Sequence, residues 1–196
     1  MATQIFFISE SYFKEHTPVN LNVEPQLVTM GISDAQFLHI QQILGSKLYK
    51  SIEAKVADGT ISSDPTNINY KVLLDDYINP SLVQWALYEC IPYLKFKMMN
   101  KGVVNQNSDN SAQIDLEEMK FLQESIRNKA EFYTQRLSDH IIGNMSFFTE
   151  YTSANRIDDL LPERTAYFCG LNLDGDDKFA IERFLGLNSH VINANI

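Results

Sequence analysis

The sequence predicts a mainly α protein, in which a helical bundle body precedes an extended, partly irregular carboxy-terminal arm that can include short β-strands. Up to residue 142, apolar residues recur at spacings of three and four, as on one face of a helix. After Gly143 this periodicity ends, and proline and glycine residues are spread along the chain. A length of 196 residues has room for one domain with an arm. We therefore expect a body over residues 1–142 and an arm over residues 143–196.

The composition is that of an acidic globular protein. Sixteen Lys and Arg residues against 25 Asp and Glu residues give a net charge of −9 and a pI near 4.8. Sequence-independent DNA binding comes from basic side chains that neutralise phosphates, so this class of function is excluded. The hydrophobic fraction of 44% is ordinary for a folded chain and argues against general disorder.

Cysteine content and hydropathy bear on the compartment. Cys90 and Cys169 are too few for a disulfide framework or a structural zinc site, which favours a reducing compartment. The first ten residues lack the basic region of a signal peptide, and we expect none. The most apolar stretch, residues 82–99, is interrupted by charged residues and by Pro92, which favours a buried helix over a membrane span.

The first elements are short. Ser9 can cap a helix that begins at Glu10, and Pro18 lies beyond its end. Residues 19–30 are mixed in character and interrupted by Pro25, so a loop is expected there. From Ser33 to Leu44 the apolar spacing predicts a helix, Gly45-Ser46 breaks it, and a second helix follows over residues 47–56.

The middle of the body is predicted to contain its central helix. Residues 60–67 read as a surface connection, and Asn67 is a candidate cap for a helix to Ile78. Asn79-Pro80 starts the next helix, which is apolar on nearly every side, is expected to kink at Pro92, and closes at Lys101-Gly102.

The longest helix and the arm follow a polar loop over residues 105–111. Apolar residues at a spacing of three or four, including Leu122, predict one helix over residues 114–142. In the arm, residues 165–173 alternate as a strand does and residues 176–185 can form a short helix.

The arm needs support from outside itself. Ordering its fifty or so residues costs on the order of 50–100 kcal/mol. Burying its five large aromatic residues offsets only about 10–15 kcal/mol. Contact with the body or with a neighbouring chain must supply the rest. The candidate contact residues are Phe147, Phe148, Tyr151, Tyr167, Phe168, Leu171 and Leu173.

No catalytic, cofactor or metal motif emerges from the sequence. The four histidines are isolated from one another and form no metal-binding pattern. The acidic run over residues 174–177 lacks the ligand spacing of a calcium loop and is better read as a polar turn. Nucleophile and phosphate-loop motifs are missing, so we expect no enzyme, no cofactor and no metal. An enzyme would need a site built from residues far apart in the sequence.

The order of segments resembles the head-tail connector, or adaptor, proteins of tailed bacteriophages, especially the ring proteins of crAss-like phages. The resemblance covers about residues 8–140. It rests on Ile8-Ser9-Glu10, on residues 43–49 (ILGSKLY), on the Asn79-Pro80 helix with Trp85-Ala86-Leu87, and on the NKGVVNQNSDNS loop leading into residues 127–133 (RNKAEFY) and Arg136-Leu137.

The resemblance implies a structural virion protein and not an enzyme. Such a subunit forms a dodecameric ring at the phage neck, joins the portal to the tail and extends the DNA channel. Its partners are further copies of itself, the portal protein and the next tail or neck ring protein. Double-stranded DNA passes through the lumen without specific binding, and no membrane is involved. The protein is made in the host cytoplasm, and the arm, residues 143–196, contacts the portal or a neighbouring subunit.

The residues leave a second reading open. A standalone cytosolic helical domain with a regulatory or ligand-binding role would also have this composition, and its carboxy-terminal region would fold back onto its own core. The fate of the residues after Gly143 separates the two readings.

Overall fold

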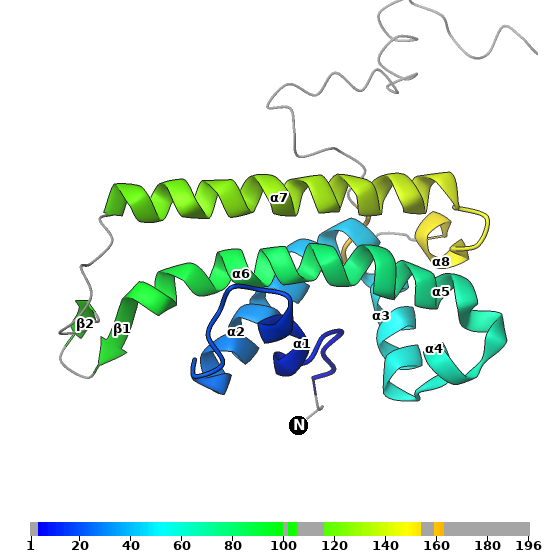
Figure 1. Cartoon of the computed structure of the whole chain (residues 1–196). Coiled ribbons are helices and arrows are strands. Elements are labelled where there is room, and N and C mark those ends of the chain that lie inside the picture. The colour runs from blue at the N-terminus through cyan, green and yellow to red at the C-terminus, as the bar shows by residue number, and fades with distance from the viewer. Residues whose placement is uncertain (1–3, 100–101, 106–115, 154–158, 163–196) are drawn as a thin grey trace, which may run out of the picture. The chain divides into compact units, whose positions relative to one another are not determined.

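The computed structural model describes residues 4–99, 102–105, 116–153 and 159–162. All of them belong to Met1–Arg164, the first of the two units into which the chain divides. This part is mainly α-helical, as predicted (Figure 1). Its α-helices are α1 (Glu10–Glu15), α2 (Pro25–Ala35), α3 (Gln41–Ala57), α4 (Thr60–Ser63), α5 (Ile68–Val72), α6 (Asn79–Lys95), α7 (Leu116–Gly143) and α8 (Thr149–Thr152).

Shorter elements connect these helices. Two π-helical turns are η1 (Gln36–Ile40) and η3 (Leu73–Ile78), and η2 (Pro65–Asn67) is a 3₁₀ turn. Strands β1 (Phe96–Met99) and β2 (Gly102–Asn105) pair antiparallel, with Phe96 opposite Asn105. None of the described helices is long and apolar enough to cross a membrane. The strand predicted over residues 165–173 and the helix predicted over residues 176–185 lie outside the described residues.

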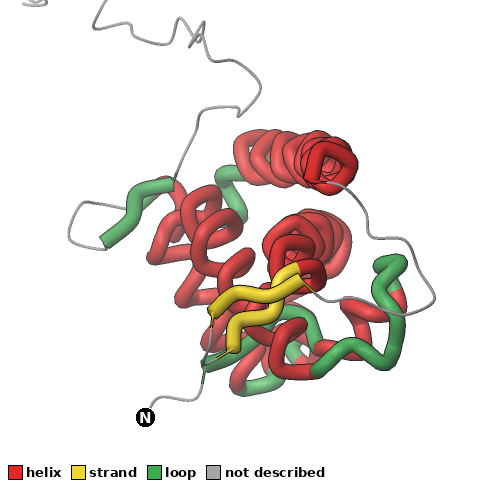
Figure 2. Tube along the Cα trace, turned by 90° about the vertical axis from the view of Figure 1, so that its left-hand side faces the viewer, coloured by secondary structure: helices red, strands yellow, loops and turns green. Residues whose placement is uncertain are grey.

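Helix α6 is the middle layer of the body. It packs against α2 on one side and α7 on the other, and α7 runs antiparallel to it (Figures 1 and 2). The approach of α2 is close, because a Cβ at Gly31 would lie 2.2 Å from Cys90 Sγ of α6. On the other side, Thr134 of α7 accepts a 2.8 Å hydrogen bond from Trp85 Nε1 and makes a 3.1 Å hydrogen bond with Ser81. The central helix predicted from its apolar sequence is therefore confirmed.

The described helices are more continuous than the sequence predicts. Helical backbone passes from α5 through η3 into α6, and the Asn79 N–H bonds the carbonyl of Leu74, five residues earlier. This wide turn comes immediately before Pro80, which has no N–H and would crowd the carbonyl four residues before it. A similar turn in η1 joins α2 to α3, where the Gln41 N–H bonds the Gln36 carbonyl.

Three boundary predictions were wrong. Helix α2 begins at Pro25 in what was expected to be a loop, because proline is suited to the first turn of a helix, where its missing N–H costs nothing. Asn67 does not cap α5; Asp64, which accepts from the Thr66 N–H at 2.9 Å, caps the preceding turn. Helix α6 ends at Lys95, one turn after Pro92, and β1 replaces the helix expected up to Met99.

Other local predictions are confirmed. Ser9 caps α1, since its side-chain oxygen accepts a hydrogen bond from the Tyr12 N–H. Helix α7 covers almost the predicted range and buries most of its predicted apolar stripe, with Leu122 as an exposed exception. Gly45 breaks the helical path of α3, with φ 71° and ψ 155°.

The kink at Gly45 receives a returning segment of the chain. It leaves the N–H of Ser46 available to the Leu160 carbonyl at 3.0 Å, while the Leu160 N–H donates to Ser46 Oγ at 3.2 Å. Pro162 lies over the kink, so that a Cβ at Gly45 would be only 2.7 Å from Pro162 Cδ. Glycine is therefore required at position 45 for two independent reasons, its backbone conformation and the contact with Pro162.

Replacing Gly45 with Ala is expected to lower the free energy of unfolding by about 1–3 kcal/mol from backbone strain alone, and further if Pro162 cannot move away. Chemical denaturation monitored by circular dichroism measures the change. Gly143→Ala is the matched control, because a Cβ there meets nothing within 4 Å and position 143 lies in the last turn of α7. Equal stability of the two variants would contradict this account of the kink.

Candidate functional site

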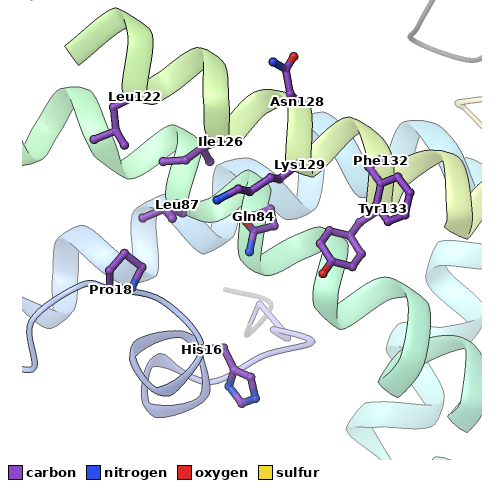
Figure 3. A pocket seen from close by; sticks show the side chains of 10 residues that line it. All are labelled: His16, Pro18, Gln84, Leu87, Leu122, Ile126, Asn128, Lys129, Phe132 and Tyr133. Carbon is purple, nitrogen blue, oxygen red and sulfur yellow. The ribbon is translucent and has the colours of Figure 1, made fainter. Parts of the chain in front are cut away.

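A groove runs along one flank of α6, between α7 and the connection from α1 to α2 (Figure 3). We call it the α6–α7 groove. Its volume is about 740 Å³, within the range of ligand and peptide sites. Gln84 and Leu87 of α6 form its floor, and His16 and Pro18 form the side opposite α7.

The α7 side of the groove follows from helical spacing. Leu122, Ile126, Lys129 and Tyr133 are three or four residues apart and therefore lie on one flank of the helix. Figure 3 shows Leu122 and Ile126 turned towards Leu87, and Lys129 reaching over the floor of the groove. Lys129 is the only Lys, Arg, Asp or Glu among the described residues that line the groove, and it makes no ion pair with a described residue.

The outward side of α7, next to the groove, exposes two aromatic rings. Phe121 is 76% exposed and Phe132 is 61% exposed. They lie about three helical turns apart, which places them on the same side of the helix, with Ser125 and Asn128 between them. We call these four residues the α7 outer face. Because both rings are exposed to water on the same side of the helix, this face is a candidate surface for contact with another macromolecule.

The α7 outer face does not stand out in the helical periodicity of the sequence. Leu122 was assigned to the inward stripe of α7, but it is exposed and lines the groove. Phe121 and Phe132 lie opposite the buried stripe formed by Met119, Ile126, Ala130 and Leu137. Plotting all aromatic residues of this segment around a helix, in addition to those that fit the stripe, would have revealed them.

The predicted contact residues after Gly143 have different surroundings. Phe147 is 54% exposed, whereas Phe148 and Tyr151 are buried in the body. The Phe148 and Tyr70 rings pack edge to face, with the ring centroids 5.5 Å apart. The remaining predicted contacts lie outside the described residues: Tyr167, Phe168, Leu171 and Leu173. Contact of this region with another subunit or a portal stays a prediction.

Glu150 of α8 fastens this region to the body. Its carboxylate accepts hydrogen bonds from Tyr70 Oη at 2.8 Å and from Ser51 Oγ at 2.8 Å. Burial alone would raise the pKa of the Glu150 carboxyl. The Glu150 backbone N–H, Tyr70, Ser51 and Lys55 outweigh burial and lower that pKa below its ordinary value. Burial, together with Glu150, raises the pKa of Tyr70, which therefore stays a hydrogen-bond donor.

His39 and Cys90, two further titratable groups of the body, have structural surroundings. The His39 ring stacks on Trp85 with centroids 3.7 Å apart, and its Nε2 is 2.9 Å from a carboxylate oxygen of Glu89. Burial, with Glu89 and Asp34 nearby, raises the pKa of the Cys90 thiol to about 12, so this thiol is a poor nucleophile. No group of three or more His, Cys, Asp or Glu residues in the described part of the chain could hold a metal ion.

Comparison with known families gives one result. Residues 40–159 match the model of a family of unknown function, DUF6712. The chain belongs to this family. The matched region of this DUF6712 protein begins at Ile40, the last residue of η1, and ends at Asp159, next to the Leu160 that contacts Ser46. It includes α6 and all of α7. Neither the comparison with curated proteins nor that with solved structures gives a match.

Tyr70→Phe is expected to lower the free energy of unfolding by about 1–2 kcal/mol at neutral pH, because it removes a hydrogen bond to a partly buried carboxylate while keeping the ring that packs on Phe148. Tyr93→Phe is a control, since no described partner of the Tyr93 hydroxyl is found. Denaturant titrations of both variants and the parent protein provide the comparison.

The penalty of Tyr70→Phe should depend on pH. The folded-state pKa of Glu150 is lowered, so its contribution to stability is full above the ordinary value of 4.5 and is lost as the pH falls through the lower, folded-state value. The difference in stability between the parent and Tyr70→Phe should therefore shrink on acidification below about pH 4.5. A difference that grows in acid would show that Glu150 does not bind Tyr70 as an anion.

Proposed function

We propose that this DUF6712 protein is a structural subunit of a tailed-phage neck. Copies of the protein assemble into a ring that joins the portal to the tail and extends the DNA channel. The observation that carries the proposal is the α7 outer face, where Phe121 and Phe132 are exposed beside an apolar groove on a 28-residue helix. A partner that covers this face removes two aromatic rings from water.

Two further observations support it. The segments that resemble head-tail connector proteins fall largely in described elements of the body: α1, α3, α6 and α7. The net charge of −9 suits a ring around DNA, because an acidic lumen repels phosphates and lets the duplex slide. In this proposal the virion neck is the site of action, and the portal, the next neck or tail protein and further copies of the chain are the partners.

One observation favours the alternative, a standalone helical domain that regulates or binds a ligand. The chain after Gly143 folds back onto its own body at Phe148, at Tyr151 and at the Leu160 contact with Ser46. A groove of about 740 Å³ would then hold a small molecule or a peptide. This alternative predicts a stable monomer in solution.

Native mass spectrometry of the purified full chain, with and without a portal protein, distinguishes the two functions. The proposal predicts a closed oligomer, formed alone or on the portal. The double variant with Phe121→Ser and Phe132→Ser should lower the abundance of that oligomer at least tenfold, because two exposed aromatic contacts are lost while the core is untouched.

Ile68→Ser combined with Val72→Ser is the matched control. These exposed apolar residues lie one turn apart on α5 and belong neither to the α7 outer face nor to the α6–α7 groove, so assembly should continue. A full-length protein that stays strictly monomeric and ignores portal contradicts the neck-ring proposal and supports the alternative.

A further inference from the structure

A second exposed apolar surface lies on α2 and η1. Its members are Met30, Asp34, Phe37 and Leu38, which recur at the three- and four-residue spacing of one helix face, and we call them the α2 ridge. Leu38 is 53% exposed, and Phe37 and Met30 are about 40% exposed. Asp34 is half-buried within the ridge and makes no ion pair with a described residue.

The α2 ridge and the α6–α7 groove lie on opposite flanks of α6. Around a helix of 3.6 residues per turn, Glu89 lies about 140° from Gln84 and about 160° from Leu87, the two residues that floor the groove. Glu89 binds His39 of η1, so η1 covers the flank away from the groove. Leu38, next to His39 in the sequence, is 53% exposed and so lies on the solvent side of η1.

The two surfaces complement each other in shape and charge. The groove is a hollow lined mainly by apolar side chains, with Lys129 as its one charged described residue. The ridge is an apolar row on the outside of a helix, with Asp34 as its one charged residue. Each of these two charges lacks an ion-pair partner in the described part of its own chain.

We infer that the α2 ridge of one copy seats in the α6–α7 groove of the next, with Asp34 facing Lys129. Two different surfaces on opposite flanks make a head-to-tail contact, which repeats from copy to copy and closes into a ring when the rotation per subunit allows it. A two-fold dimer, by contrast, would pair one surface with itself. This inference rests on the proposed function and assigns its subunit contact.

A charge exchange in the full-length protein tests this pairing. Lys129→Glu and Asp34→Lys each place like charges opposite one another, so each should raise the Kd of self-association about tenfold or more. The double variant restores opposite charges in reversed order and should return the Kd to within a few-fold of the parent value. Sedimentation velocity over a concentration series measures the association, and thermal melts confirm that each variant is folded.

Two control variants carry the same charge changes elsewhere. Lys120 is on α7 outside the groove, and Asp58 is at the exposed end of α3. The variants Lys120→Glu and Asp58→Lys should therefore assemble as the parent does. If the parent forms oligomers but the double variant is no better than the singles, the pairing is overturned while the proposed function stands. If the parent never associates, with or without portal, both are overturned.

Discussion

The body depends on covering α6. This helix is apolar on nearly every side, so it must be buried against two other layers to be stable in water. Gly31 lets α2 come close to Cys90, and Thr134 of α7 satisfies the polar atoms of Ser81 and Trp85 on the opposite side. With α2 and α7 on two opposite sides of α6, two flanks of the helix are left for other elements to cover. One flank is closed by η1, and the other remains as the groove.

Helix α3 plays a second organising role, because it receives the chain as it returns from α7. Its Ser46, Lys47 and Ser51 contact residues from α8 to Leu160. The kink at Gly45 makes the last of these contacts possible, since it interrupts the helical hydrogen bonds and leaves the Ser46 N–H to bond the Leu160 carbonyl. The described segments 149–153 and 159–162 are therefore held against α3 by one glycine and a few hydrogen bonds.

Periodicity and capping rules predicted much of the fold, and the failures have identifiable physical causes. The long α7, the Ser9 cap and the break at Gly45 follow from local chemistry and were predicted. Prolines misled the boundaries, because Pro25 starts a helix and a π-helical turn accommodates Pro80 without a break. The pairing of β1 with β2 is a contact between two segments, and helical periodicity does not predict such a contact.

The candidate site was harder to predict than the fold. The aromatic residues after Gly143 lie outside any helical pattern and were predicted to contact another chain. Phe148 and Tyr151 are instead buried in the core of the body. Phe121 and Phe132 sit within a strong helical pattern, and only the burial of the opposite side distinguishes them from core residues. The groove is lined by three segments that are distant in sequence, so no local sequence motif predicts it.

Cysteine cross-linking tests most directly whether the α2 ridge of one copy binds the α6–α7 groove of the next. In a Cys169→Ser background, Leu38→Cys and Leu122→Cys place one thiol on the α2 ridge and one in the groove. Buried Cys90 is a poor competitor for oxidation. A chain carrying both substitutions should oxidise to a ladder of covalent oligomers that ends at the ring size, while either single variant stays uncrosslinked. Monomers from the double variant, or dimers from a single variant, would contradict the head-to-tail contact.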